Sequence, residues 1–289
     1  MFKKFFTIAA AAVVVAGCGK ETVSVKDGAS QLKPIAFTSY TQGEVKADVT
    51  ADNLTTINVL AEHKATDTPA KYFYEAISLS GGKGTSSAYW PSSGTMYFYA
   101  SNSAISDAGV VTVGSVANDV VVASKTEVSC PGSGDVSLAF SHIFAKFVVT
   151  AKVDSNALKA TISKIEVVAK APVSYDVKAS AWTTAQDAGS SDYYTGTKDI
   201  VTTTADTVVS GGYVAPQEGV AVNVYYKLTN TDGDITYADS TANPAKITGL
   251  AFTEGKKHTL NLTFDAAKIA FEVTQVADFG DGGSTNKDL

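Results

Sequence analysis

The stretch that decides the fold is IFAKFVVTAKV, residues 143–153. Apolar side chains occupy every second position from Ile143 to Val153, and two lysines and a threonine stand among the positions between them. Successive side chains of a β-strand point to opposite faces of the sheet. This period of two therefore predicts a strand with one buried face.

The same alternation recurs along most of the chain. The apolar stripe of residues 136–140 runs in the opposite phase, and the slip falls at Ser141 and His142, which predicts a β-bulge or a bend. The segment NTDGD, residues 230–234, lies between two stripes and predicts a hairpin loop. Further alternating stripes lie in residues 96–100, 165–169, 222–228 and 260–264.

Short strands separated by glycine-rich turns, without a convincing helical stripe, predict an all-β fold. One seven-stranded sandwich takes about 100 residues. The length of the chain therefore favours two tandem β-sandwich domains, which we place at residues 34–133 and 134–280. The break between them falls in the loop of residues 129–134, and residues 281–289 form a polar tail.

The N-terminus predicts export and a lipid anchor. Two lysines precede an apolar run at residues 5–15, which is too short to span a bilayer and fits a secretory signal. The run ends in Val15, Ala16, Gly17 and Cys18, a pattern that resembles the bacterial lipobox. We expect residues 1–17 to be removed, Cys18 to carry acyl chains that hold the protein on a membrane, and residues 18–33 to form a tether.

Charge and cysteine content exclude several classes of function. The net charge is −6 and all 23 basic residues are lysines, without a basic cluster, which argues against nucleic acid as a partner. With Cys18 acylated, Cys130 has no partner for an intramolecular disulfide. The histidines have no metal-ligand spacing, so we expect no metal and no cofactor; we interpret His142 as structural and His258 as solvated.

The residue patterns contain no catalytic constellation. The motif of a phosphate-binding loop and that of a serine-nucleophile elbow are both absent from the sequence. Trp90, Trp182, Tyr193 and Tyr194 are candidates for stacking on a carbohydrate or for contacting a partner. Aromatic side chains also fill sandwich cores and interfaces, and that interpretation is favoured here.

Several segments resemble one family of bacterial proteins when taken in order. They are AYWP with GTMYFYA (residues 88–91 and 94–100), NDVVVA (118–123), VSLAFSHIFAKF (136–147), GKKHTLNL (255–262), and IAF with VADF (269–271 and 276–279). The third of these is the most specific, and in the fourth His258 replaces the tyrosine of the family pattern. Together they resemble the fimbrillin-like lipoproteins of Bacteroidetes, the family of type V pilins, over about residues 34–280.

The resemblance implies two transthyretin-like, Greek-key β-sandwich domains behind a lipoprotein signal. It also implies pilus subunits that polymerise by β-strand addition, in which a surface protease removes an N-terminal strand and another subunit's strand fills the groove. The best-known pilins of the family are cut after arginine, and this chain has none. A donor strand at the C-terminal end would comprise Ile269, Phe271 and Val273.

The leading hypothesis is therefore a non-enzymatic fimbrial subunit, or a tip, anchor or accessory protein, that acts in assembly and adhesion. It would lie at the outer membrane or cell surface, or in the fimbria if processed, with other subunits and host or bacterial surface proteins or glycans as partners. The alternative is a surface glycan-binding lipoprotein of a nutrient-uptake system. A secreted hydrolase on a β scaffold is a third, weaker hypothesis.

Overall fold

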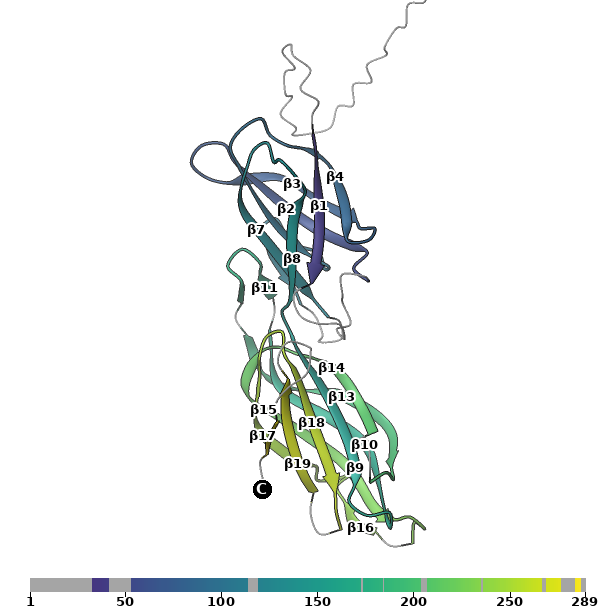
Figure 1. Ribbon diagram of the computed structural model, residues 1–289. Helices are drawn as coiled ribbons and strands as arrows, with labels where there is room; N and C mark the ends of the chain where they lie inside the picture. The colour runs from purple at the N-terminus through teal and green to yellow at the C-terminus, as the bar shows by residue number, and fades with distance from the viewer. Residues whose placement is uncertain are drawn as a thin grey trace, which may run out of the picture. The chain divides into compact units, whose positions relative to one another are not determined.

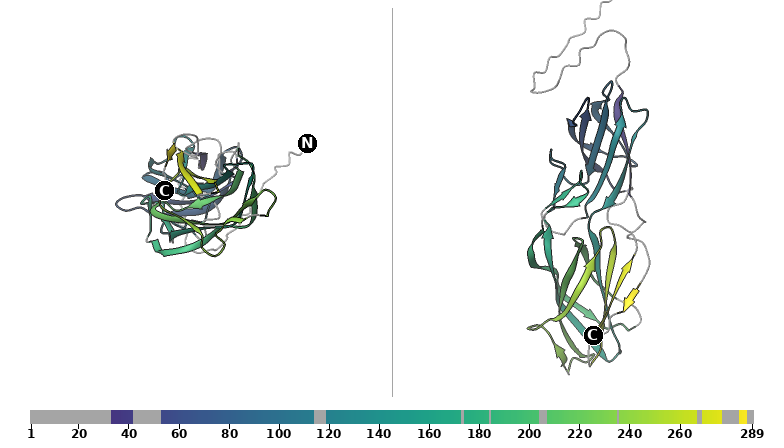
Figure 2. Two further views of the ribbon diagram at one scale, coloured as in Figure 1. Left: turned by 90° about the horizontal axis from the view of Figure 1, so that it is seen from below. Right: turned by 90° about the vertical axis from the view of Figure 1, so that its left-hand side faces the viewer.

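The computed structural model describes residues 33–41, 53–113, 119–172, 174–183, 185–203, 207–234, 236–266, 269–276 and 284–286; for the last two ranges it describes the backbone only. Every regular element in these ranges is a β-strand, which confirms the all-β class (Figures 1 and 2). Among the described residues, no helix has the length and apolar character needed to cross a membrane.

Seven strands form the largest sheet, in the order β3-β2-β5-β7-β8-β1-β4. The first of the described strands, β1, lies inside this sheet, antiparallel to β4 and parallel to β8 (Figure 1). The strands are β1 (Pro34–Thr41), β2 (Thr56–Lys64), β3 (Ala70–Ser78), β4 (Lys83–Tyr89), β5 (Thr95–Ser101), β7 (Val121–Ser129) and β8 (Val136–His142).

The alternating residues of these strands meet in a first apolar cluster. It includes Ile35 and Phe37 of β1, Phe98 of β5 and Leu138 of β8, all fully buried. The hydrogen bonds of β8 thus join it to β1 and β7. A domain boundary at residues 133 and 134 would separate β8 from the sheet that it completes, and the two-domain division itself stays a prediction.

Two five-stranded sheets contain most of the remaining strands. One has the order β14-β9-β18-β19-β20, with β18 parallel to β9; the other has the order β13-β10-β15-β16, and β17 also pairs with β15. The strands are β9 (Ala145–Val153), β10 (Leu158–Pro172), β13 (Ala185–Ile200), β14 (Thr207–Val214), β15 (Gln217–Asn230), β16 (Thr236–Asp239), β17 (Ala245–Phe252), β18 (Lys257–Phe264), β19 (Ile269–Val276) and β20 (Ser284–Asn286).

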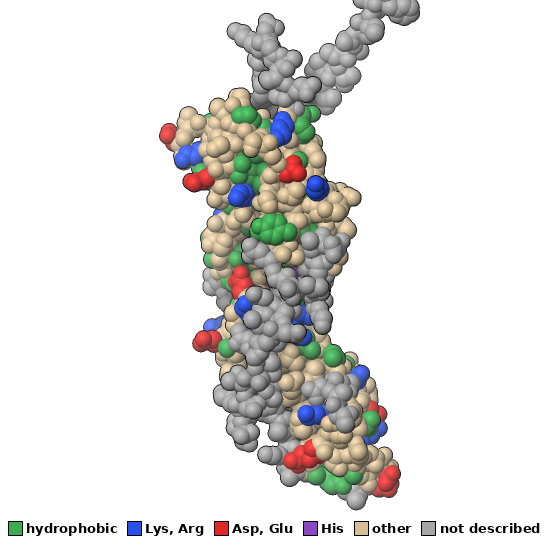
Figure 3. All heavy atoms as spheres, in the orientation of Figure 1, with side chains coloured by type: hydrophobic (Ala, Val, Ile, Leu, Met, Phe, Trp, Pro, Cys, Tyr) green, Lys and Arg blue, Asp and Glu red, His purple; other side chains and the backbone are tan. Residues whose placement is uncertain are grey.

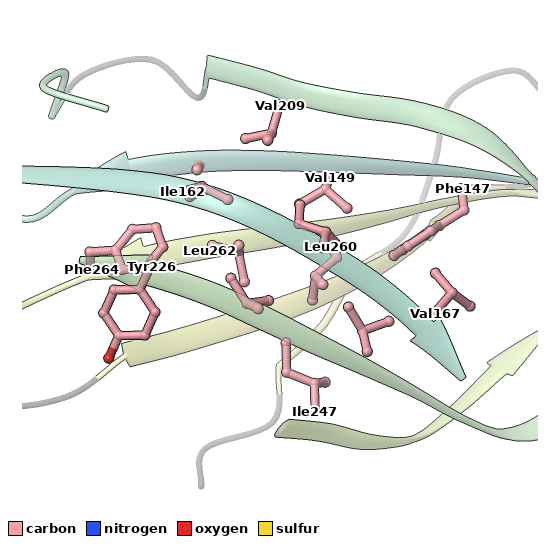
Figure 4. Close-up of a cluster of buried hydrophobic side chains, with 14 of the residues drawn as sticks. Phe147, Val149, Ile162, Val167, Val209, Tyr226, Ile247, Leu260, Leu262 and Phe264 are labelled. Atoms are coloured by element: carbon pink, nitrogen blue, oxygen red, sulfur yellow. The ribbon is translucent and has the colours of Figure 1, made fainter. Parts of the chain in front are cut away.

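The two five-stranded sheets pack face to face around a second apolar cluster (Figure 4). The stripe of residues 143–153 forms β9, and its alternate residues Phe147 and Val149 lie in this cluster with Ile162 and Val167 of β10 (Figure 4). Burial of such side chains contributes about 1.5–3 kcal/mol each. The predicted hairpin loop at residues 230–234 joins β15 to the antiparallel β16, as expected.

A third, smaller sheet has the order β12-β11-β6 and joins segments that are far apart in the sequence. Its strands are β6 (Val110–Thr112), β11 (Ser174–Asp176) and β12 (Ala181–Trp182). A third apolar cluster surrounds it and includes Leu60 of β2, Val111 of β6 and Tyr175 of β11. No alternating pattern in the sequence predicts this sheet, because strands of two or three residues are too short to show a period of two.

The two edges of the seven-stranded sheet are joined by side chains. A turn with Gly81 and Gly82, both at positive φ, connects β3 to β4, but only Ser80 and Lys83 pair as in a hairpin. Beyond that point the Glu75 carboxylate of β3 accepts hydrogen bonds from the Ser87 N–H, at 3.0 and 3.1 Å, and from the Ser86 hydroxyl, at 2.5 Å. An inward-pointing carboxylate of this kind keeps an edge strand from pairing with other chains.

The predicted slip at Ser141 and His142 is a bend between strands of different sheets. The β8 strand ends at His142, and β9 begins at Ala145. His142 Nδ1 lies 2.9 Å from a carboxylate oxygen of Asp119, and both side chains are buried, as expected for a structural histidine. Asn102 supports the pair, because its side chain bonds the backbone of Asp119 and Val121.

We expect Asp119→Ala to lower the free energy of unfolding by about 1–3 kcal/mol, because it removes a hydrogen-bond partner of the buried His142. Asp119→Asn keeps a hydrogen-bond acceptor at the same place and should cost clearly less. Denaturant titration of the two variants measures the difference. Equal losses would mean that an uncharged acceptor at this place does not stabilise the fold.

The interpretation of His258 as a solvated residue is wrong. It is buried rather than solvated, lies edge-on to Phe252 with ring centroids 5.0 Å apart, and accepts a hydrogen bond from the Thr253 N–H at 3.1 Å. Burial disfavours the charged imidazolium and lowers the pKa of His258 to about 4. The local sequence KKH, residues 256–258, suggested solvent, whereas the alternation with Leu260 and Leu262 places His258 on the buried face.

This burial predicts a loss of stability in mild acid. An unfolded chain protonates histidine near its usual pKa of about 6.5, whereas the folded chain protonates His258 at about 4. Stability should therefore fall by about 3 kcal/mol as the pH drops through that window, and level off below it. His258→Gln keeps an acceptor for Thr253 without titrating. Denaturation measured from pH 7 to pH 4 should show a smaller fall for this variant than for the parent.

Candidate assembly groove

The strand β1 occupies a place that a strand from elsewhere could also occupy. Its first half pairs with β4, from Pro34 opposite Tyr89 to Thr38 opposite Lys83. Its second half pairs with β8, from Phe37 opposite Val136 to Thr41 opposite Phe140. We call the space between β4 and β8 that β1 fills the assembly groove.

Apolar side chains hold β1 in the groove. Ile35 and Phe37 are fully buried, and the Phe37 ring meets the Phe98 ring edge-on with centroids 5.5 Å apart. Leu138 and Phe140 of β8 are also fully buried and belong to the same cluster. The strand β1 therefore fills the groove with large apolar residues at alternate positions.

Polar contacts fix β1 at both ends. At one end the Ser39 N–H donates to the Gly82 carbonyl at 2.7 Å, and the Ser39 hydroxyl donates to the same oxygen at 3.1 Å. At the other end the Trp90 N–H donates to the Lys33 carbonyl at 3.0 Å, and Lys33 Nζ donates to the Gly132 carbonyl at 3.2 Å. These contacts define how far an occupant of the groove extends.

The ladder on the β4 side is irregular at its start. The register shifts between Pro34 and Ala36, and Pro34 has no N–H to donate. Removing β1 would leave unpaired backbone groups along β4 and β8 and open an apolar slot between them. Such a slot binds another strand through main-chain hydrogen bonds, with side-chain pockets giving specificity.

The tryptophans proposed as carbohydrate contacts lie in the apolar clusters. Trp90 is 5 % exposed, belongs to the first cluster and packs edge-on against Phe98. Trp182 is partly buried against Phe144 and Tyr175, with ring centroids 5.1 and 5.2 Å away. The glycan-binding alternative is not favoured, because neither ring presents the open face on which a sugar would stack.

Tyr193 connects two sheets. Its hydroxyl donates to the Phe147 carbonyl of β9, and the Ser210 hydroxyl of β14 donates to the Tyr193 carbonyl at 3.2 Å. Burial raises the pKa of the Tyr193 hydroxyl well above its usual value. Its ring lies over Gly212, where a Cβ would come within 2.9 Å of it. Tyr194 packs against the second cluster and is partly buried.

The remaining predicted site residues are described in part or not at all. Ile269, Phe271 and Val273 belong to β19, whose backbone pairs with β18 on one side and with the short β20 on the other (Figure 2). The lipobox residues Val15, Ala16, Gly17 and Cys18 lie outside the described residues. Cys130 is free and partly exposed, and burial raises the pKa of its thiol.

Charged side chains outside the groove pair with one another. On β10, Lys164 bonds Glu166 and lies 2.9 Å from Asp192, and the Tyr225 hydroxyl donates to Glu166 at 2.7 Å. The bonds from Lys164 and Tyr225 lower the pKa of Glu166 to about 2. Acidic and basic side chains are interspersed on the face in view in Figure 3, and no group of three metal-binding side chains occurs among the described residues.

The groove was partly accessible to sequence reasoning. The sequence placed the start of the first domain at residue 34, but β1 is too short and too polar at its end for its place inside the sheet to be inferred. The residues that anchor it, such as Gly82, Trp90 and Gly132, are distant in sequence and carry no local signal for this role. Only a resemblance to proteins that exchange strands pointed to the N-terminal strand.

A family model described as fimbrillin-like matches residues 43–278, most of the chain. The chain belongs to the fimbrillin-like family. Membership places the protein among fimbrial and adhesion proteins, which act at the cell surface. No curated protein matches this fimbrillin-like chain.

Solved structures from Bacteroides share the fold. A fimbrial protein of Bacteroides vulgatus is 14 % identical with a TM-score of 0.57, covering 83 % of this chain and 98 % of its own. Proteins of Bacteroides ovatus and Bacteroides uniformis, provisionally named as cell adhesion proteins, are 15 % and 14 % identical, each with a TM-score of 0.53. They cover 89 % and 84 % of this chain and 99 % and 96 % of their own.

Proposed function

We propose that this fimbrillin-like protein is a surface subunit whose assembly groove exchanges β1 for a strand of another subunit. The observation that carries the proposal is the position of β1: the first strand that the structure describes lies inside the sheet, between β4 and β8. A cut in the segment that follows β1 would separate this strand from the rest of the sheet. The opened groove then binds a donor strand and links two subunits.

We propose β19 as the donor strand. Ile35-Ala36-Phe37 of β1 recurs unchanged as Ile269-Ala270-Phe271 of β19. In the same direction and register, Ile269 and Phe271 would take the places of Ile35 and Phe37, and Val273 that of Ser39. Lys268 would replace Pro34 and supply the N–H that proline lacks. Compared with β1, β19 therefore offers one more backbone N–H and one more apolar residue, Val273, on the face that the groove would bury.

The strand-exchange proposal can be tested with a chain cut just after β1. A protease site is introduced between residues 41 and 53, and the cut protein is mixed with labelled peptides of residues 33–41 or 268–276. We expect both peptides to displace β1, with the second binding more tightly, because its alternate apolar residues fill the groove. The 268–276 peptide carrying Phe271→Asp is the matched control and should not bind.

The outcomes separate two questions. If neither peptide enters the cut protein, the groove does not accept strands and the proposed function fails. If the 33–41 peptide binds and the 268–276 peptide does not, the groove accepts strands but β19 is not the donor. Before any peptide is added, circular dichroism checks that the cut chain keeps its β structure.

We propose further that Cys18 anchors the newly exported protein in the outer membrane. The support is the lipobox at residues 15–18 and the family of lipoproteins that the chain resembles. Two or more acyl chains on one residue anchor a protein far better than one. Because the chain lacks arginine, a protease that cuts after arginine cannot release it. Another protease acts, or β1 and the lipid stay in place.

The intact mass of the protein taken from its native cell surface distinguishes these routes. A chain that begins at an acylated Cys18 would keep β1 and would fit a terminal or anchor subunit. A chain that begins after residue 41, without lipid, would have an open groove and fit a polymerising subunit. A chain that begins elsewhere in the tether, unacylated and with β1 retained, would contradict both the anchor and the exchange.

A further inference from the structure

The β11–β12 hairpin and its turn, residues 174–183, form a rigid unit that we call the clasp. At its base the Thr183 N–H donates to the Ser174 carbonyl at 2.9 Å, and the two hydroxyl oxygens lie 2.7 Å apart. At its tip Asp176 Oδ1 accepts hydrogen bonds from the N–H groups of Lys178 and Ala179, at 2.8 and 2.9 Å. Such local bonds preorganise a hairpin.

The clasp extends the backbone pairing of a distant segment. Tyr175 pairs with Val111 in an antiparallel ladder, and the Val177 N–H donates to the Gly109 carbonyl at 2.9 Å. The clasp lies in the sequence between β10 and β13, whereas β6 lies between β5 and β7. A ladder therefore joins the sheet that contains β10 to the part of the chain that contains the seven-stranded sheet.

Lys178 adds a second connection. Its Nζ lies 2.5 Å from a carboxylate oxygen of Glu62 on β2 and 5.5 Å from the centroid of the Tyr99 ring on β5. Its stem lies over Gly109, where a Cβ would come within 2.7 Å of Lys178 Cγ. The two charged side chains are 28 % and 14 % exposed, so solvent screens this ion pair less than a surface pair.

Apolar burial is the third connection. Tyr175 and Val177 are buried in the third cluster together with Leu60 and Tyr99 of the seven-stranded sheet. Phe144, in the link between β8 and β9, belongs to the same cluster and touches Trp182 of the clasp. Without the clasp, these residues of β2 and β5 would lose part of the apolar cluster that covers them.

We propose that the clasp couples the first and second apolar clusters, so that the seven-stranded sheet and the face-to-face pair of sheets unfold as one cooperative unit. The chain otherwise passes between them through Ile143 and Phe144 alone. A link of two residues does not by itself make the two parts unfold together. A ladder, a partly buried ion pair and a shared core together make the opening of one part expose the surface of the other.

Hydrogen exchange in the native state tests this inference. Pro172 and Ala185 are paired opposite each other, so residues 173–184 can be replaced by Asn-Gly, which closes β10 and β13 as a hairpin. In the parent, the slowest amides of β5 and β15 should have the same protection factor, because both need global unfolding. In the variant the two protection factors should differ by at least about tenfold.

A milder pair of variants keeps the test decisive if the replacement does not fold. Lys178→Ala removes the ion pair of the clasp, and Lys159→Ala removes a lysine of β10 paired at 2.8 Å with Asp199 of β13 in the same five-stranded sheet. We expect Lys178→Ala to speed exchange in β6 and β11 and to make the protection factors of β5 and β15 differ, and Lys159→Ala to do neither. Different protection factors of β5 and β15 in the parent, or equal ones in Lys178→Ala, would overturn the inference.

Discussion

The burial of Ile35 and Phe37 between β4 and β8 is the interaction on which the seven-stranded sheet depends. A first strand that lies inside a sheet closes the ladder between two strands that come much later in the chain. The sheet cannot be completed until β8 has been made and placed, so its contacts are long-range and form late. The same two side chains set the spacing of apolar residues that the proposed exchange would demand of a donor strand.

Most strands could be predicted from the sequence because they bury one face. The alternation of residues 143–153, 222–228 and 260–264 gave β9, β15 and β18 correctly. Period two reports only which residues share a face; it does not report which strand lies beside which. For that reason the clear alternation of β8 does not show that this strand pairs with β1 and β7.

The candidate site was less accessible than the fold. Trp90 and Tyr193 drew attention as large aromatic residues, but a sequence does not distinguish a ring on a surface from one in a core. His258 was misjudged for the same reason, since its lysine neighbours suggested solvent. The clasp was missed because strands of two or three residues have no measurable period, and its partners lie about 60 to 120 residues away in the chain.

The seam between β3 and β4 has a mechanical consequence. Glu75 and Tyr72 reach β4 by side chains, from the carboxylate to the Ser87 N–H and from the phenol to the Tyr89 carbonyl. Flexible side chains tolerate changes of separation that a backbone ladder does not. The distance between β3 and β4 can therefore increase while the backbone ladders of the sheet stay paired. The strand β4 can then move together with the strand that pairs with it. This seam thus lies one strand away from the place where the proposed exchange would occur.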